Sequence, residues 1–495
     1  MAIRLTSVRV RKSLSKIGIA MHPTLSRITL LGLSVLVAGS LASCASTPAK
    51  KPAASTGEKK SFNLKEDPYA STYRRVAAAP VILRGATVLT GTGTRLDNAD
   101  VLIRDGKIAG VGASLAAPSD AVEVNASGKW ITPGLIDVHS HLGVYASPGV
   151  SAHSDGNEAT SPTTPNVWAE HSVWPQDPGF GTALAGGVTT LQILPGSANL
   201  IGGRGVTLKN VYATTYQGMK FPGAPWGLKM ACGENPKRVY GQRSGPSTRM
   251  GNVAGYRAAF IEARDYLKKQ TGDSPGKRDL KNDTLSNAMN GDILVHNHCY
   301  RADEMAIMLD LAKEFGFKIA AFHHGVEAYK LSDRLAREGI CGALWADWWG
   351  FKMESFDGIQ ENIALVDRPE GSCAIVHSDD SEGIQRLNQE AAKVMAHATR
   401  IGMNIAPERA IRWITSNAAK SLGVLDKTGT LEVGKMADVV LWNGNPFSTY
   451  AKAEQVYVDG AKMYDRAIPS LRPRSDFLLG TDPNPTTYSV EGGAR

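Results

Sequence analysis

The sequence predicts an α/β protein in which a (β/α)8 TIM barrel is joined to a small composite β-sandwich domain. Eight short apolar runs in the middle of the chain are typical of strands, and helical patterns lie between the later runs. Short β-rich segments of similar character flank this region on both sides. The middle region spans roughly 290 residues, which suits such a barrel.

Residues 1–43 are typical of a signal peptide with a lipobox. Basic residues precede the apolar run "ITLLGLSVLVAGSLASC", which is short for a membrane span and ends in small residues. "LASC" resembles the lipobox of bacterial lipoproteins, in which the cysteine, here Cys44, is lipidated. Because Ala45 follows it, the resemblance implies export and anchoring in the outer membrane, facing the periplasm or the cell surface. A plain cleaved signal or an uncleaved anchor is the alternative.

Residues 44–78 predict a flexible tether, because "ASTPAKKPAASTGEKK" is polar and has no periodicity. The net charge of +8 comes from this end of the chain: residues 1–43 carry six basic and no acidic side chains, and residues 44–60 carry a net +3. The rest of the chain therefore has a net charge of −1, which gives no electrostatic reason to expect nucleic acid. Contact with the membrane is expected through the lipid anchor only.

Residues 79–130 and 429–467 are the two parts of the predicted β-sandwich. "PVILRGATVLTGTG" and "ADVLIRDGKIAGVG" in the first part resemble "GTLEVGKMADVVLWNG" and "AEQVYVDGAKMYD" in the second. This matching character favours one small domain assembled from both flanks, with two unrelated β flanks as the alternative. Residues 468–495 form a C-terminal tail.

Residues 131–428 form the predicted barrel. Helical segments such as "ADEMAIMLDLAKEFG" end at a glycine, as helix C-caps commonly do. The expected strands are "GLIDVHSH", "VTTLQIL", "GVTLKN", "GLKMACG", "DILVHNH", "KIAAFHH", "CGALWAD" and "SCAIVHSD".

Polar side chains gather where these strands end. They are His139, His141, Glu234, His296, His298, His323, His324, Asp379 and Asp380. Barrel enzymes carry their catalytic groups at this rim. Neutral imidazoles and carboxylates suit a divalent ion such as Zn²⁺, which activates water and polarises a carbonyl group. The pattern therefore predicts one or two divalent ions, preferably zinc.

"PGLIDVHSH", the strand-end histidines and aspartate, and "GTLEVGKMADVVLW" together resemble the amidohydrolase superfamily over roughly residues 80–465, in its imidazolonepropionase-like and prolidase-like branch. The resemblance implies the same barrel and a composite β-sandwich. It also implies that His139 and His141 are the metal pair of the first strand. Many relatives carry a carboxylated lysine on the fourth strand, for which Lys229 is the candidate. Others use a glutamate just after the strand, and we prefer Glu234 because it lies at the rim.

"HNHCYRADE" resembles a family pattern in which the histidine three places before Arg-Ala-Asp binds metal, which favours His298 over His296. On the sixth strand we prefer His324. Because adjacent strand residues face opposite sides, we expect His323 to pack outward against a helix, although it stays an alternative ligand. On the eighth strand Asp379 is expected to be the catalytic proton shuttle.

Five further residues could contact the substrate. Arginines of the long fourth-strand loop are suited to bind a carboxylate by bidentate contacts, although a solvated loop is the commoner outcome. His377 could touch the substrate or support a ligand. The substrate-binding candidates are Arg238, Tyr240, Arg243, Arg249 and His377.

The cysteines after Cys44 show no CxxC spacing, and we expect buried free thiols. They are Cys232, Cys299, Cys341 and Cys373.

The predicted function is hydrolysis of an amide or cyclic-amide C–N bond by metal-activated hydroxide. The expected partner is a small-molecule substrate such as a dipeptide or N-acyl amino acid, and the sequence leaves open a homo-oligomer. A deaminase or lactamase of the same superfamily is the alternative within this class. A non-catalytic envelope binding lipoprotein with a relict barrel, or a structural envelope protein, would be an alternative of another class.

Overall fold

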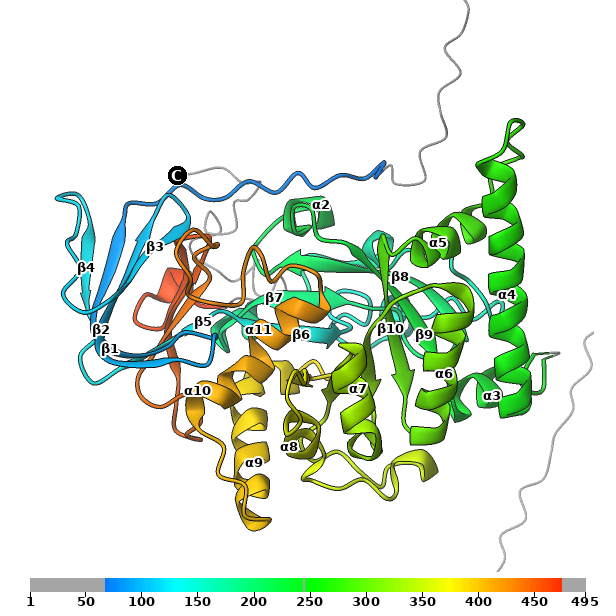
Figure 1. Ribbon diagram of the computed structural model, residues 1–495. Helices are drawn as coiled ribbons and strands as arrows, with labels where there is room; N and C mark the ends of the chain where they lie inside the picture. Colours follow the sequence, from blue (N-terminus) through cyan, green and yellow to red (C-terminus); the bar gives the residue numbers. More distant parts are fainter. Residues whose placement is uncertain (1–66, 244, 474–495) are drawn as a thin grey trace, which may run out of the picture. The chain divides into compact units, whose positions relative to one another are not determined.

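The computed structural model describes residues 67–473 except residue 244, and these residues belong to one compact unit (Figure 1). The predicted signal peptide, the predicted lipidation of Cys44 and most of the predicted C-terminal tail lie outside the described residues. Among the helices of the described ranges, none combines the length and the apolarity that crossing a membrane requires.

Eight strands form a nearly closed barrel sheet, in the order β13-β12-β11-β10-β9-β8-β7-β6. A hydrogen bond links the loop after β13 to β6, because the Asp379 N–H donates to the His139 carbonyl at 3.0 Å. All eight predicted strands are present. Their bounds are β6 (Leu135–Ser140), β7 (Val188–Ile193), β8 (Ile201–Lys209), β9 (Trp226–Ala231), β10 (Ile293–Cys299), β11 (Ile319–His324), β12 (Cys341–Leu344) and β13 (Ala374–Val376).

The third barrel strand departs from the expected pattern. β8 pairs with both β7 and β9 in the antiparallel sense, whereas the other neighbouring barrel strands are parallel. Only residues 194–200 connect β7 to β8, which is too short for the crossover that a parallel pair needs. The end of β8 at Lys209 therefore lies away from the rim where the other strands end.

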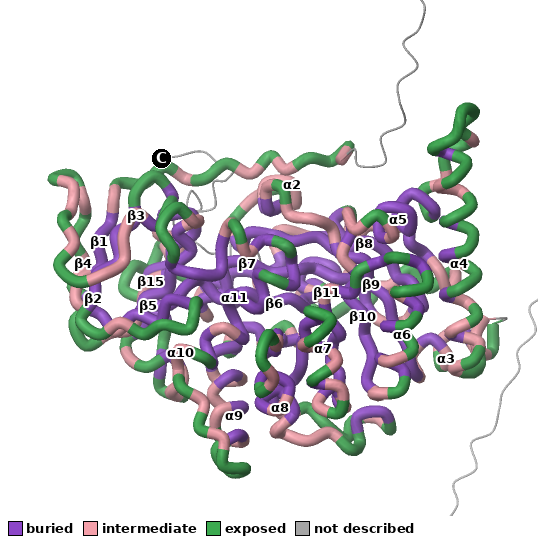
Figure 2. The backbone as a smooth tube through the Cα atoms, in the orientation of Figure 1, coloured by how far each residue is buried: buried purple, intermediate pink, exposed green. Residues whose placement is uncertain are grey.

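Helices cover the outside of the barrel. α9 buries Leu387, Ala391, Val394 and Ala398, which recur on one face at helical spacing. Figure 2 shows the buried residues concentrated in the barrel strands. The helices are α1 (Pro178–Ala185), α2 (Tyr216–Met219), α3 (Glu234–Tyr240), α4 (Arg249–Gln270), α5 (Leu280–Met289), α6 (Ala302–Phe315), α7 (Ser332–Glu338), α8 (Asn362–Asp367), α9 (Leu387–Arg400), α10 (Pro407–Ala410) and α11 (Ser416–Ser421).

The two flanks of the chain share one sheet, in the order β16-β15-β14-β5-β1-β2-β3, with β4 paired to β1. The central contact is the antiparallel pair of β14 with β5, which brings residues from both ends of the chain together. A two-sheet sandwich stays a prediction. The strands are β1 (Val81–Leu89), β2 (Arg95–Arg104), β3 (Lys107–Gly112), β4 (Val122–Asn125), β5 (Trp130–Pro133), β14 (Val439–Trp442), β15 (Ala453–Val458) and β16 (Ala461–Asp465).

Two further expectations differ from the structure. The end of the predicted tether is bound rather than free: the Thr72 N–H donates to the Gln217 carbonyl, and the Tyr73 hydroxyl donates to Asp459 at 2.6 Å. The cysteines are not free thiols. Cys232 pairs with Cys299, and Cys341 pairs with Cys373, because neighbouring strand ends hold their Cα atoms 5.2 and 4.5 Å apart. Cysteines far apart in sequence cannot reveal such a pairing.

Candidate metal centre

Two histidines reach the barrel interior from strand β6. His139 lies inside the strand and His141 directly follows it, so both face one side. The Nε2 atoms of His139 and His141 lie 3.4 and 3.2 Å from the same oxygen of Asp379, Oδ1. The His141 Nδ1 lies 2.8 Å from the Leu194 carbonyl oxygen, which can only accept. The His141 Nδ1 therefore carries a proton, which it donates to this carbonyl oxygen.

Asp379 reaches this point from the loop after β13. Its φ of 54° is left-handed, an uncommon conformation for a residue other than glycine. The second carboxylate oxygen lies 3.8 Å from the His324 Nδ1. Burial pushes the pKa of Asp379 upward, but the hydrogen bond and positive charge of His141 outweigh it and hold the pKa below its ordinary value. The carboxylate is thus held in its ionised form.

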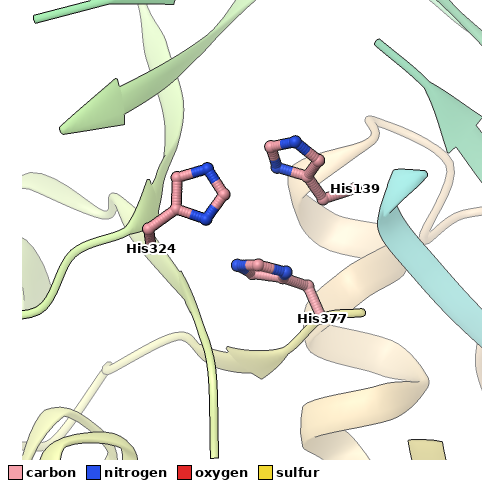
Figure 3. Close-up of side chains that lie close together, drawn as sticks. All are labelled: His139, His324 and His377. Carbon is pink, nitrogen blue, oxygen red and sulfur yellow. The ribbon is translucent and has the colours of Figure 1, made fainter. Parts of the chain in front are cut away.

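His139, His324 and His377 form a second group of converging nitrogens. They come from β6, β11 and the loop after β13, and their rings point toward one another (Figure 3). Trp345 stacks on the His324 ring with 4.3 Å between the ring centroids. Each of the two groups, His139–His324–His377 and His139–His141–Asp379, has candidate ligand atoms within 4.8 Å of one another. His139 belongs to both groups.

Burial keeps these imidazoles neutral. The pKa of His296 falls to about 3 and that of His377 to about 4, while the pKa values of His139 and His324 lie well below their ordinary value. The main cause in each case is the removal of the ring from water, and the positive charge of Lys229 adds to it. A neutral imidazole presents a lone pair, as a metal ligand must.

Lys229 brings an amine into the same site from strand β9. Its Nζ lies 3.2 Å from the His139 Nε2, and the side chain is buried. Burial lowers the pKa of Lys229 to about 8, against the opposing effect of the Asp379 charge. The structure therefore places the alternative fourth-strand residue in direct contact with the first-strand pair.

Glu234, the preferred fourth-strand residue, lies elsewhere. It begins α3, and its Oε1 is 3.7 Å from the Lys352 Nζ. It belongs to neither group of converging ligand atoms among the described residues. The preceding Gly233 has a φ of 82°, and this turn carries the chain from the end of β9 into the helix. This placement differs from the prediction of Glu234 as a metal ligand.

The fifth strand supplies His298 and His296 at different depths. The His298 ring lies 4.6 Å from that of His324, beside the converging groups but in neither of them. The Asn235 amide nitrogen lies 3.4 Å from the His298 Nε2. His296 instead contacts His323, with 2.9 Å between its Nδ1 and the Nε2 of that ring.

His323 does not pack outward, which corrects the sequence prediction. It is fully buried, and its Nδ1 lies 2.8 Å from the His139 Nδ1 inside the barrel. Successive side chains of a strand normally face opposite sides, but this alternation ends here because His324 has a left-handed φ of 71°. The strand pattern ends at this residue, so two consecutive side chains both contact the site.

The predicted substrate-binding residues differ in their contacts and in their burial. Arg249 forms ion pairs with Glu304 and Glu354, which occupy its guanidinium group. Tyr240 is buried, whereas Arg238 and Arg243 are exposed. His377 lies within the second group of nitrogens described above.

Lys352 is a residue at this rim that the sequence did not single out. Its Nζ donates to the Asn235 side-chain oxygen at 3.0 Å and lies 4.1 Å from the centre of the Tyr300 ring. Burial lowers its pKa, although Glu234 opposes the shift. The available signal was its position in the aromatic-rich loop "DWWGFKMESFD".

The side chains present fit a divalent ion. The Nδ1 atoms of His298 and His324 and both ring nitrogens of His377 are buried without a hydrogen-bond partner in the described chain. The Nε2 atoms of His139 and His141 face a carboxylate oxygen. Acceptors that converge in a buried site are stabilised by a cation.

The chain is similar to known hydrolases. A model of the amidohydrolase family matches residues 370–466. The amidohydrolase TasK of Hapsidospora irregularis is 31% identical over 461 residues, which cover 83% of this chain and 46% of that protein, so the chain spans less than half of this relative's length. Imidazolonepropionase of Brucella anthropi is 24% identical over 392 residues, which cover 70% of this chain and 87% of that protein. The crystal structure of an amidohydrolase from Thermotoga maritima is 36% identical, covers 78% of this chain and all of that one, and superposes with a TM-score of 0.72.

Proposed function

The chain belongs to the amidohydrolase family and is a hydrolase acting on carbon–nitrogen bonds, and from this premise we propose that it cleaves the amide or cyclic-amide bond of a small substrate with the help of divalent metal. The preferred substrate is a dipeptide or an N-acyl amino acid, and the preferred metal is zinc. The observation that carries the proposal is the convergence of His139, His141 and Asp379, whose ligand atoms lie within 4.8 Å of one another.

Asp379 is proposed to move the proton during hydrolysis. A divalent ion supplies Lewis acidity, which polarises a carbonyl group and makes water a stronger acid. An ionised carboxylate at the mouth of the barrel accepts a proton from the attacking water and then donates it to the departing nitrogen. The lowered pKa of Asp379 supports the accepting role, and the contacts of its Oδ1 with His139 and His141 hold it beside the ligands.

Lys229, rather than Glu234, is proposed as the fourth-strand ligand. Its Nζ lies 3.2 Å from the His139 Nε2, and a pKa of about 8 leaves an appreciable fraction of the amine neutral near neutral pH. A neutral amine reacts with carbon dioxide to give a carbamate, and its nitrogen loses one proton to solvent. The carbamate presents two oxygen atoms that suit a divalent ion.

Lys352 is proposed to bind the carboxylate of the substrate. The Asn235 side chain links Lys352 to the candidate ligand His298: its oxygen accepts from the Lys352 Nζ, and its nitrogen lies 3.4 Å from the His298 Nε2. The Tyr300 ring, 4.1 Å from the same Nζ, holds the ammonium group at the rim. Trp345, which stacks on His324, would form the apolar wall beside it. An N-acyl amino acid or dipeptide offers both the carboxylate and the amide bond that this arrangement requires.

The protein is proposed to act outside the cytoplasm, anchored through Cys44. The two disulfides within the described residues support an oxidising compartment. Cys44 itself lies outside the described residues. Globomycin treatment of expressing cells, followed by mass measurement of the mature N-terminus, tests lipidation at Cys44.

Metal analysis and a substrate screen of the purified protein test the proposed function. We expect one or two divalent ions per chain, and turnover of a dipeptide, N-acyl amino acid or lactam that is lost with a chelator and restored by Zn²⁺. Lys229→Met and Glu234→Gln are a matched pair: the first is expected to lose metal, and the second to keep it. A protein that binds no divalent ion, or that hydrolyses its substrate equally well without one, would contradict the proposal.

A further inference from the structure

We propose that His323, His296 and Gln192 form a directional hydrogen-bond chain that holds His139 in the tautomer able to bind a metal ion. These three are positioning residues, because they act on the site through His139. The inference rests on the proposed function, in which His139 is a ligand.

The chain runs from the site into the closed interior of the barrel. His139 Nδ1 lies 2.8 Å from His323 Nδ1, and His323 Nε2 lies 2.9 Å from His296 Nδ1. His296 Nε2 then lies 3.3 Å from the Gln192 amide group. All four side chains are at most 1% exposed. Each ring nitrogen of the chain therefore depends on its neighbour for a partner.

The proposed function sets the direction of this chain. In it the ion is bound by the lone pair of the His139 Nε2, which lies 3.2 Å from the Lys229 Nζ and 3.4 Å from the Asp379 Oδ1. The proton of this neutral ring therefore sits on Nδ1. From there His139 donates to His323, whose own proton must lie on Nε2 and be donated to His296. His296 in turn carries its proton on Nε2, facing Gln192.

Gln192 has to end the chain as an acceptor. Its amide oxygen is buried without a hydrogen-bond partner, while its amide nitrogen is the atom at 3.3 Å from His296. A half turn of the amide exchanges two groups of nearly equal shape. The oxygen then accepts from the His296 Nε2–H, and the unpaired oxygen is satisfied. The geometry thus assigns the orientation with the oxygen toward His296.

The opposite direction would block the site. If the Gln192 amide donated to His296, every proton in the chain would move to the other nitrogen. His139 would then carry its proton on Nε2, pointing at Lys229 and at Asp379, and it would have no lone pair for a metal ion. A ligand-supporting partner of this kind is typically worth 10- to 100-fold in metal affinity.

Zinc affinity, measured by chelator competition, tests the inference with three variants. Gln192→Met removes the acceptor at similar size, Gln192→Glu keeps it, and Thr190→Val is the control. Thr190 lies two residues earlier on β7, is buried, and has an unpaired hydroxyl. We expect Gln192→Met to weaken zinc binding by roughly 10- to 100-fold, and the other two to bind zinc within about threefold of the wild type.

Long-range ¹H–¹⁵N spectra of the zinc-loaded wild type show which ring nitrogen of each histidine carries the proton. A purely structural role of Gln192, His296 and His323 would not determine these positions. They are expected to show His139 protonated on Nδ1 and His323 and His296 protonated on Nε2. Thermal unfolding of the metal-free variants separates loss of affinity from loss of fold. Equal zinc affinity of Gln192→Met and the wild type, or equal weakening in Gln192→Met and Gln192→Glu, would overturn the inference. A wild type that binds no zinc would instead overturn the proposed function.

Discussion

Two residues of the candidate site adopt backbone conformations that most side chains avoid. His324 and Asp379 have φ values of 71° and 54°. A non-glycine residue in the left-handed region costs on the order of 1–3 kcal/mol and persists only where the surroundings enforce it. At His324 this conformation lets two consecutive histidines contact the same site. At Asp379 the left-handed conformation occurs at the residue whose N–H donates to the His139 carbonyl, where the last barrel strand meets the first.

Asp379→Asn tests the proton role of this carboxylate. The amide keeps an oxygen atom for the ion but accepts a proton far less readily, so kcat is expected to fall by roughly 10²- to 10⁴-fold. Metal content should stay close to that of the wild type. Steady-state kinetics and elemental analysis of the same preparation measure both quantities. Full turnover by the metal-loaded variant would show that another group moves the proton.

At the scale of elements, neighbouring strand ends determine which cysteines meet. Gly342 and Ala374 are register partners in the parallel pair of β12 and β13, so Cys341 and Cys373 lie side by side. The disulfide closes a loop with a sequence separation of 32. Closing such a loop removes conformational freedom from the unfolded chain, and this loss of chain entropy is one accepted explanation of disulfide stabilisation.

Replacing Cys341 and Cys373 together by alanine is expected to lower the free energy of unfolding by about 3–4 kcal/mol. Urea unfolding under oxidising conditions measures the difference. Dithiothreitol should reduce the difference in the free energy of unfolding between wild type and variant, because it opens the Cys341–Cys373 disulfide in the wild type only. A double variant as stable as the wild type under oxidising conditions would refute this contribution.

At the scale of the whole described unit, buried ion pairs join the barrel to the flank sheet. The Lys209 Nζ at the end of β8 lies 3.3 Å from Asp438 and 2.9 Å from Asp459. Asp438 also accepts from the Thr428 hydroxyl at 2.7 Å. These contacts exist because β8 runs antiparallel and ends at Lys209 on the side of the barrel where Asp438 and Asp459 lie.

The buried histidines predict that the metal-free protein is sensitive to acid. Six fully buried imidazoles have lowered pKa values, so below pH 6.5 the unfolded chain binds protons that the folded chain does not. The free energy of unfolding therefore falls as the pH falls, by at most about 1.4 kcal/mol per pH unit for each imidazole that stays neutral in the folded protein. Burial raises the pKa of Asp137 to about 7, and that carboxyl group opposes the effect.

Urea unfolding of the chelator-treated protein at pH 6.5, 6 and 5 checks this slope. His296→Asn should show a slope smaller by about one proton, because the pKa of His296 in the folded protein is about 3. Stability that does not change between pH 6.5 and 5 would contradict the assignment of neutral buried rings.

Strand positions were predictable because they depend on local pattern. Alternating apolar runs and turn residues located all eight barrel strands, and the spacing of His139 and His141 was enough to place both on one face. The matching β segments at the two flanks likewise predicted strands that the structure pairs through β5 and β14. These features require only neighbours in sequence.

Local pattern and residue type thus predict the set of strands, the family resemblance and the residue types that meet at the rim. They do not predict that β8 is antiparallel, that the cysteines pair, that His323 points inward, or that Lys229 rather than Glu234 contacts His139. The physical reason is that each of these depends on the distance between segments far apart in the chain, or on a single left-handed residue such as His324 at a strand end. The periodicity of apolar residues along the chain gives neither the distance between such segments nor the φ of a single residue.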